Sequence, residues 1–195
     1  MHLFDSRRLA LLGALAAVNS VVRLMGAGFA GIETAFALVI LAAYVFGSRF
    51  GMALGILSIL ASALMSGGLG PWLPFQLMAT GLIGFGAGLL PKPKSLRLRL
   101  TVLSIFAAIS SYVYGALLTV WTWPLFVGEG TSLSYSSSIG AIDNLGRFVK
   151  FEFVSGGLLW DTGRAITTIA LILLTGKALM TTLERAATRA NYETA

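Results

Sequence analysis

The sequence predicts an all-α integral membrane protein, a bundle of six transmembrane helices whose N-terminus and C-terminus are both cytoplasmic. Three observations predict this fold class. Of the 195 residues, 56% are hydrophobic and only 11% are charged, whereas soluble domains contain about 25% charged residues. The mean hydropathy is +0.85, and uncharged runs long enough to cross a bilayer as a helix recur along the chain. A domain of this size cannot bury so much apolar surface in its own core, so the excess must face lipid.

Each predicted helix follows from one of these runs. The first run ends at Arg23, and the second ends before Arg49. The segment 50–91 carries no charge and is long enough for two helices, and Ser66-Gly-Gly-Leu-Gly-Pro71 divides it because small residues and proline favour turns. A long extracellular loop of about residues 126–157 joins the last two helices, and we expect residues 1–195 to form a single membrane domain. The six predicted helices cover roughly residues 7–25, 31–47, 50–66, 72–90, 99–124 and 158–184.

The basic residues predict how the bundle is oriented. With a cytoplasmic N-terminus, ten Lys and Arg residues fall in inner segments and four in outer segments. The turn from Pro91 to Arg99 contributes four of the ten. Because cytoplasmic loops of membrane proteins carry an excess of Lys and Arg, the distribution of the basic residues indicates a multi-pass membrane protein with both termini inside, and the net charge of +6 does not indicate a nucleic-acid-binding protein. We expect the membrane to be a prokaryotic plasma membrane.

The residue types present exclude several kinds of chemistry. The chain has no cysteine and a single histidine, His2, which excludes a disulfide scaffold, a cysteine nucleophile, a Ser-His-Asp triad and a His-based metal site. Gly84-Phe-Gly-Ala-Gly88 lies in the middle of a hydrophobic run and is not a dinucleotide-binding motif, and no Walker A sequence is present. We therefore expect no enzyme activity and no ATP hydrolysis by this chain, no covalently bound cofactor and no metal.

Small residues recur on one face of the first predicted helix. Ala10, Ala14 and Ala17 are spaced at i, i+4 and i+7, and small residues let helix backbones approach closely within lipid. One interpretation is packing inside the bundle, and the other is a docking face for a second membrane subunit. Gly51-xxx-Gly55 and Gly84-xxx-Gly88 have similar spacing, and we expect both pairs to pack inside the bundle.

Polar and aromatic residues gather at the predicted outer ends of the helices. An ionisable group within a span is costly unless it faces the bundle interior or water, so Asp161 and Arg164, which can also pair at i, i+3, are functional candidates. The alternative interpretation is an aromatic belt at the membrane interface with a bridging ion pair. The gathering at one end, beside a long loop, favours an aromatic-lined ligand cavity that opens outward. The candidate substrate-binding residues are Arg23, Glu33, Trp72, Phe75, Gln76, Tyr112, Trp121, Trp123, Asn144, Trp160, Asp161 and Arg164.

Three stretches carry a resemblance to a known family. They are Phe46-Gly-Ser-Arg-Phe-Gly51, Ser66-Gly-Gly-Leu-Gly-Pro-Trp-Leu-Pro-Phe-Gln76 and Trp160-Asp-Thr-Gly-Arg-Ala165. With the six predicted helices, the length of 195 residues and the Ala-xxx-Ala pattern of the first helix, nearly the whole chain resembles the substrate-binding S-component of energy-coupling factor (ECF) vitamin transporters. The Gly-Pro-Trp-x-Pro-Phe-Gln and Asp-x-x-Arg-Ala sequences look like the branch associated with cobalamin.

The resemblance implies a subunit of an ABC-type importer. Such an S-component binds a vitamin or related micronutrient from outside and docks on a transmembrane coupling (T) subunit, which sits on two cytoplasmic ATPase subunits. It implies cobalamin (vitamin B12) or a related compound as the ligand here, with riboflavin, thiamine or a queuosine-type compound as alternatives. It also implies that Ala10, Ala14 and Ala17 form the docking face and that the loop Met25–Gly31 covers the site. The family often has Asn shortly after the Arg-Ala of the last helix, where this chain has Thr167-Thr168, and this departure affects the ligand contact expected there.

Two other function classes compete with this interpretation. A membrane-embedded enzyme would use Asp161, Arg164 and Glu33 as its catalytic group, but the sequence offers no carboxylate pair, metal cluster or nucleophile with a base at a usable spacing. An autonomous channel or membrane carrier is disfavoured because no intramembrane carboxylate relay and no inverted repeat is visible. Substrate consumption by the purified chain would support the enzyme, and flux into liposomes without partners would support the carrier.

Overall fold

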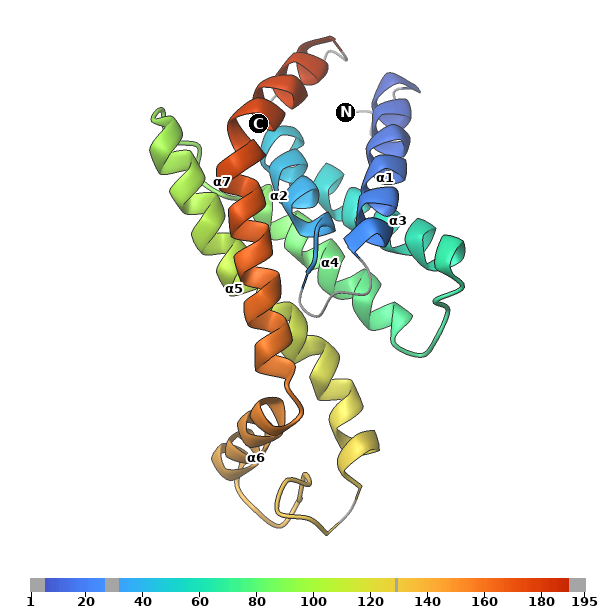
Figure 1. Ribbon diagram of the computed structural model, residues 1–195, viewed down its shortest axis with the longest axis vertical. Helices are drawn as coiled ribbons and strands as arrows, with labels where there is room; N and C mark the ends of the chain where they lie inside the picture. Colours follow the sequence, from blue (N-terminus) through green and yellow to red (C-terminus); the bar gives the residue numbers. More distant parts are fainter. Residues whose placement is uncertain (1–5, 27–31, 129, 190–195) are drawn as a thin grey trace.

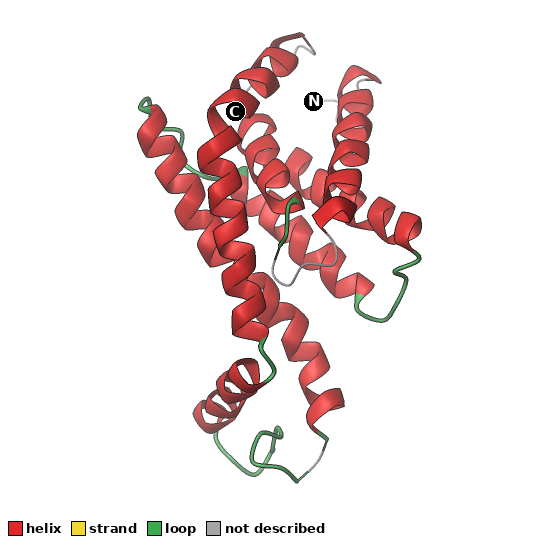
Figure 2. Cartoon of the chain, in the orientation of Figure 1, coloured by secondary structure: helices red, strands yellow, loops and turns green. Residues whose placement is uncertain are grey.

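The computed structural model describes residues 6–26, 32–128 and 130–189, and every regular element in them is a helix (Figure 2). This confirms the predicted all-α fold class. The described residues form seven helices, whereas the sequence predicted six. In chain order the helices are α1 (Ser6–Gly26), α2 (Ala35–Phe46), α3 (Ser48–Ser66), α4 (Leu73–Ala87), α5 (Leu96–Val127), α6 (Ala141–Val154) and α7 (Gly157–Arg189).

The additional helix, α6, lies within the stretch that the sequence predicted as an extracellular loop. The structure thus adds helix α6 to the connection predicted over 126–157, and α5 continues to Val127. The extracellular location of this connection stays a prediction. Helix α6 is amphipathic: its apolar residues alternate at helical spacing with Asp143, Arg147, Lys150 and Glu152. A search for uncharged runs therefore passes over it.

Four helices are long and apolar enough to cross a membrane, namely α1, α3, residues 96–125 of α5, and α7. The apolar helices α2 and α4 are shorter, with 12 and 15 residues. These lengths support a multi-pass membrane protein, and the count of six spans stays a prediction.

Helix α2 is the centre of the bundle (Figure 1). Eleven of its 12 residues are buried, and it contacts α1, α3, α4, α5 and α7. A helix that is apolar all round is buried on every side, and the side chains of Phe36, Ile40 and Leu41 are all fully buried. Because α2 touches every helix except α6, it fixes the positions of the helices that carry the candidate site.

Helices α3 and α4 pack backbone against backbone. Gly51 lies against Gly84, and Gly55 lies against the backbone of Thr80, so closely that a Cβ at any of these glycines would collide with main-chain atoms. Gly88 meets the backbone of Ser48 in the same way. The structure therefore confirms that both predicted glycine pairs pack inside the bundle, where close approach requires small residues.

Helices α5 and α7 extend beyond the other helices (Figure 1). They contain 32 and 33 residues, which is about 50 Å of helix against a hydrocarbon core of about 30 Å. Helix α1 begins and α7 ends at one end of the molecule, and α6 lies at the opposite end (Figure 1). This arrangement is compatible with both termini on one side of the membrane, and their cytoplasmic location stays a prediction.

Candidate functional site

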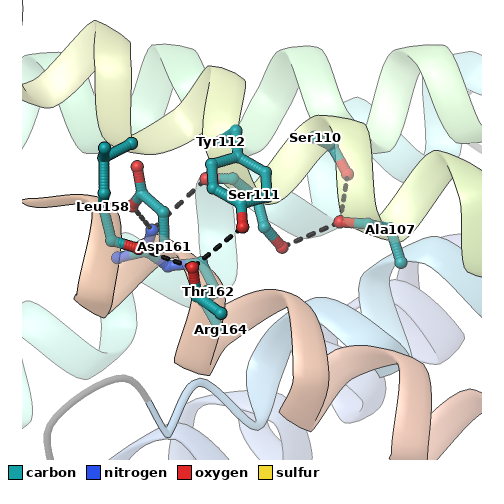
Figure 3. A network of polar contacts seen from close by, with 8 residues as sticks. All are labelled: Ala107, Ser110, Ser111, Tyr112, Leu158, Asp161, Thr162 and Arg164. Carbon is teal, nitrogen blue, oxygen red and sulfur yellow. Dashed lines mark hydrogen bonds and ion pairs between the residues drawn. The ribbon is translucent and has the colours of Figure 1, made fainter. Parts of the chain in front are cut away.

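A buried arginine lies between α5 and α7 in a network of polar contacts (Figure 3). Nη1 of Arg164 donates to the carboxylate of Asp161, one turn earlier on α7, and to the carbonyl oxygen of Ser111 on α5 at 3.3 Å. The side chains of Arg164 and Asp161 are only 11% and 4% exposed. The i, i+3 pairing that the sequence suggested therefore forms, and it lies inside the bundle, where an unpaired charge would be costly.

Gly115 on α5 makes room for this ion pair. A Cβ at position 115 would overlap the carboxylate group of Asp161, so the α5 backbone itself covers one side of that group. With this side closed, the carboxylate interacts with Arg164. The ion pair thus depends on a glycine of the neighbouring helix.

Two aromatic rings flank the guanidinium group of Arg164. Its Cζ lies 4.7 Å from the ring centroid of Tyr114 and 5.9 Å from that of Phe36. The two rings meet edge to face, with their centroids 4.9 Å apart. Guanidinium groups are attracted to aromatic faces over this range. Nε of Arg164, by contrast, is buried and has no partner among the described residues.

Further polar side chains lie on the neighbouring elements. Oγ1 of Thr80 on α4 is buried without a hydrogen-bond partner among the described residues. Glu33 lies just before α2 and accepts a hydrogen bond from a backbone N–H at the start of that helix at 3.3 Å.

Arg23 closes this region on the side of α1. Its Nη1 donates to Oγ of Ser62 on α3 at 3.0 Å. Oγ1 of Thr34 donates to the carbonyl oxygen of Val22 at 2.7 Å, which ties the segment before α2 to the end of α1. The predicted lid, Met25–Gly31, lies mostly outside the described residues.

Several buried polar atoms of this region have no hydrogen-bond partner among the described residues. Asn19 and Ser58 lie one turn before Arg23 and Ser62 on their helices, and Thr168 lies one turn after Arg164. Because buried polar groups in folded proteins are nearly always bonded, each of these atoms is a candidate donor or acceptor for a polar ligand. They are Nδ2 and Oδ1 of Asn19, Nε of Arg23, Oγ of Ser58, Oγ1 of Thr80, Nε of Arg164 and Oγ1 of Thr168.

The candidates at the start of α4 contact α5. The ring of Phe75 stacks on that of Trp121, with centroids 5.1 Å apart and planes 6° apart. Nε1 of Trp121 is buried without a partner among the described residues. Gln76 is half-buried beside Phe75, whereas Trp72 is exposed. The structure thus places Phe75 against Trp121. This contact lies closer to the C-terminal end of α5 than Ser111, the α5 residue that Arg164 contacts.

Tyr112 and Trp160 face the outside of the bundle. Their side chains are 40% and 51% exposed, and the Tyr112 hydroxyl forms a hydrogen bond of 2.8 Å with that of Thr162 across α5 and α7 (Figure 3). Exposed Trp and Tyr residues on membrane helices are typical of the interfacial belt. The structure therefore does not bring these two side chains to Arg164.

Trp123 and Asn144 belong to a separate outer unit, which consists of the end of α5, residues 130–140 and α6. Nε1 of Trp123 donates to the carbonyl oxygen of Leu133 at 2.8 Å, and its ring meets that of Phe148 at 5.3 Å. Asn144 accepts a hydrogen bond from the backbone N–H of Ser136 at 3.0 Å and donates to the carbonyl oxygen of the same residue at 2.8 Å. The polar groups of both side chains thus bind the backbone of the outer unit.

The outer unit also contains an open pocket of about 440 Å³. Its walls are mainly apolar and aromatic, as in many small-molecule sites. It is formed by α5, α6 and the segment between them, and Arg164 is not among its lining residues. The lining residues are Val120, Trp123, Tyr135, Ile139, Ala141, Asn144, Leu145 and Phe148.

The three small residues of the expected docking face are exposed. Ala10, Ala14 and Ala17 lie on the surface of α1, and a Cβ built at Gly13 would have no atom within 4 Å. These residues therefore do not pack inside the bundle. Docking of a partner on this face stays a prediction.

The network around Arg164 combines residues that the sequence indicated with others that it did not. Tyr114 had a signal, because it is an aromatic residue in the outer half of α5. Phe36 lies in a uniformly apolar run, and nothing in a single sequence shows which glycine or serine of α5 faces Asp161. The predicted members are Asp161 and Arg164, and the missed members are Phe36, Ser111, Tyr114 and Gly115. Arg23 and Glu33 bind Ser62 and the start of α2 instead.

The arrangement is suited to the recognition of a polar ligand. A fixed guanidinium group with an unbonded Nε can bind a carboxylate, a carbonyl or a phosphate. The rings of Phe36 and Tyr114 offer an apolar surface to a planar part of the same molecule.

Comparison with known proteins identifies the family of the chain. The family model described as ECF transporter, substrate-specific component, matches residues 7–182 of the chain. No curated protein and no solved structure matches the chain. The matched region includes every residue of the network around Arg164.

Proposed function

Because this chain belongs to the family of ECF transporter substrate-specific components, we propose that it binds a vitamin or related micronutrient through the network around Arg164. Its part in transport is substrate recognition, and the ATP hydrolysis that drives import belongs to the partner ATPase subunits. The family and the four long apolar helices make it a multi-pass membrane protein.

The observation that carries the proposal is the set of contacts that Arg164 makes and the one donor that it leaves unbonded. Its guanidinium group is held in one position by Asp161 and Ser111 and is flanked by two rings, yet Nε has no partner among the described residues. A preorganised donor of this kind binds an acceptor without a further ordering cost. The ligand therefore carries a carboxylate, carbonyl or phosphate group that meets Nε, and the unbonded polar atoms of Asn19 and Thr168 lie one turn from the two arginines.

A substitution at Arg164 tests this site. Arg164→Gln removes the charge and Arg164→Lys keeps it while removing the planar fork, so both should weaken ligand binding by about tenfold or more. Arg49→Gln removes the same charge from an exposed position outside the network and should leave the dissociation constant unchanged. Unaltered binding by both Arg164 variants would exclude this arginine from the site.

The identity of the ligand is a separate proposal, and cobalamin is the compound to test first. Riboflavin, thiamine and queuosine-type compounds are the alternatives. The open, aromatic-lined pocket of the outer unit, of about 440 Å³, is where the bulky part of a large ligand would lie. Mass spectrometry of the small molecule that copurifies with the chain, followed by titration of the same panel, decides between them.

Import also requires partners in this proposal. The exposed face of Ala10, Ala14 and Ala17 supports docking on a transmembrane coupling subunit that acts with two cytoplasmic ATPase subunits. Two observations would redirect the proposal: consumption of the bound compound by the purified chain would favour an enzyme, and flux into liposomes without partners would favour an autonomous carrier.

A further inference from the structure

We propose that the groove between the start of α1 and the end of α7 binds the headgroup of an anionic phospholipid. The groove has a volume of about 610 Å³. It lies at the end of the molecule opposite α6, where the first turns of α1 and the last turns of α7 stand apart (Figure 1). It is therefore separate from the network around Arg164.

The shape of the groove follows from a missing helix contact. Among the described residues, α1 contacts α2 and α3, and α7 contacts α2, α5 and α6, but α1 and α7 do not contact each other. The opening between them is bordered by Ala10, Leu11 and Ala186. Small and apolar walls of this kind leave room for an acyl chain between the two helices.

The rim of the groove is basic. Arg7 comes from α1, and Arg185 and Arg189 come from α7. The described residues that line the groove include no acid. The acidic residue next to Arg185 in sequence, Glu184, forms its ion pair with Arg99 on α5 at 3.3 Å. Arg185 and Arg189, one turn apart on α7, thus line an opening whose described lining residues include no carboxylate.

A phospholipid matches both the basic rim and the apolar walls of the groove. Guanidinium groups bind phosphate oxygens with two parallel hydrogen bonds, and basic pockets between transmembrane helices bind anionic headgroups. The start of α1 and the end of α7 lie at the same end of the molecule (Figure 1), and we place this end at the depth of the headgroups because α1, with 21 residues, matches the thickness of the hydrocarbon core. The bilayer surrounds the chain, so a lipid is present at this depth before any protein partner arrives.

The lipid retained by the full-length chain tests the proposal. Wild-type chain is reconstituted in phosphatidylcholine vesicles with and without phosphatidylglycerol, extracted in mild detergent and examined by native mass spectrometry. We expect phosphatidylglycerol to be retained and phosphatidylcholine to be lost. The double variant Arg185→Gln, Arg189→Gln should retain about tenfold less phosphatidylglycerol. Ala186→Trp, which fills the groove without a change of charge, should lower retention similarly.

A matched control separates the groove from general charge effects. Arg49→Gln, Arg97→Gln removes two exposed arginines that do not line the groove and should retain as much phosphatidylglycerol as wild type. Equal retention by wild type and the groove variants, or equal loss in the control, would overturn the proposal. Displacement of the lipid by inorganic phosphate would show a free-anion site and would also overturn it. Vitamin binding is measured separately, so a failure here does not bear on the Arg164 site.

Discussion

At the scale of single residues, Gly115, Asp161 and Arg164 act as one unit. The carboxylate lies against the glycine on α5, and the guanidinium lies against the carboxylate and the rings of Tyr114 and Phe36. A buried ion pair stabilises little by itself, but the loss of one member leaves a buried charge without a partner. The unit is therefore sensitive to small changes at any of the three positions.

The glycine can be tested directly. Gly115→Ala adds a Cβ where the Asp161 carboxylate lies, so we expect a lower melting temperature and weaker ligand binding, because the displaced carboxylate no longer orients Arg164. Gly146→Ala is the matched control, since a Cβ there has open space and alanine favours a helix. A Gly115→Ala protein that melts and binds like wild type would mean that the ion pair does not need this close contact.

The two members of the ion pair have separable roles. Asp161→Asn and Arg164→Gln should each destabilise the apo protein by about 3–5 kcal/mol, because each leaves one buried charge unpaired or one buried polar group unsatisfied. Arg164→Gln should also abolish the increase in melting temperature that the ligand produces, whereas Asp161→Asn should only reduce it. If both variants lose stability while ligand affinity stays intact, the pair is scaffold and α7 has no part in the site.

At the scale of helices, α1 and α6 have surfaces that the bundle leaves uncovered. Helix α1 presents Ala10, Ala14 and Ala17 to its surroundings. Helix α6 is held to residues 130–140 of the outer unit by Asn144 and by Arg147, whose Nη1 donates to the carbonyl oxygen of Ser134 at 2.7 Å. The exposed face of α1 has the small residues that close helix contact requires. Helix α6, through Asn144 and Arg147, fixes the segment that follows α5.

The uncovered face of α1 is expected to matter for transport and not for binding. Ala14→Trp should abolish uptake in cells that express the coupling and ATPase subunits, because a bulky side chain prevents close helix approach, while the dissociation constant of the purified chain stays near wild type. Ala170→Trp, at an exposed position of α7, should transport normally. Normal uptake by Ala14→Trp would show that the docking face lies elsewhere.

At the scale of the whole molecule, the two ends differ in chemistry. One end carries the start of α1, the end of α7 and the Arg99–Glu184 ion pair of 3.3 Å. The other end carries α6 and the serine-rich segment before it (Figure 1). The basic residues concentrate at the first end, which the positive-inside rule assigns to the cytoplasm.

The absence of cysteine makes this orientation easy to measure. In intact cells, a membrane-impermeant thiol reagent should label Ser137→Cys in the segment before α6 and should not label Lys94→Cys between α4 and α5. Both should react after permeabilisation, since both positions are exposed. The reverse pattern would invert the predicted topology and place the Arg164 network nearer the cytoplasmic face.

The sequence by itself determined the membrane environment, the helical class and the charge asymmetry, because hydropathy and basic residues act locally along the chain. It also pointed to Asp161 and Arg164, because any charge in an apolar run requires a partner. Only the tertiary structure decided that α6 is a helix of the outer unit and that Trp123 and Asn144 belong to it. It alone brought Phe36, Tyr114 and Gly115 to Arg164, because the rotation of each helix about its axis depends on packing around α2, which no single run of residues encodes.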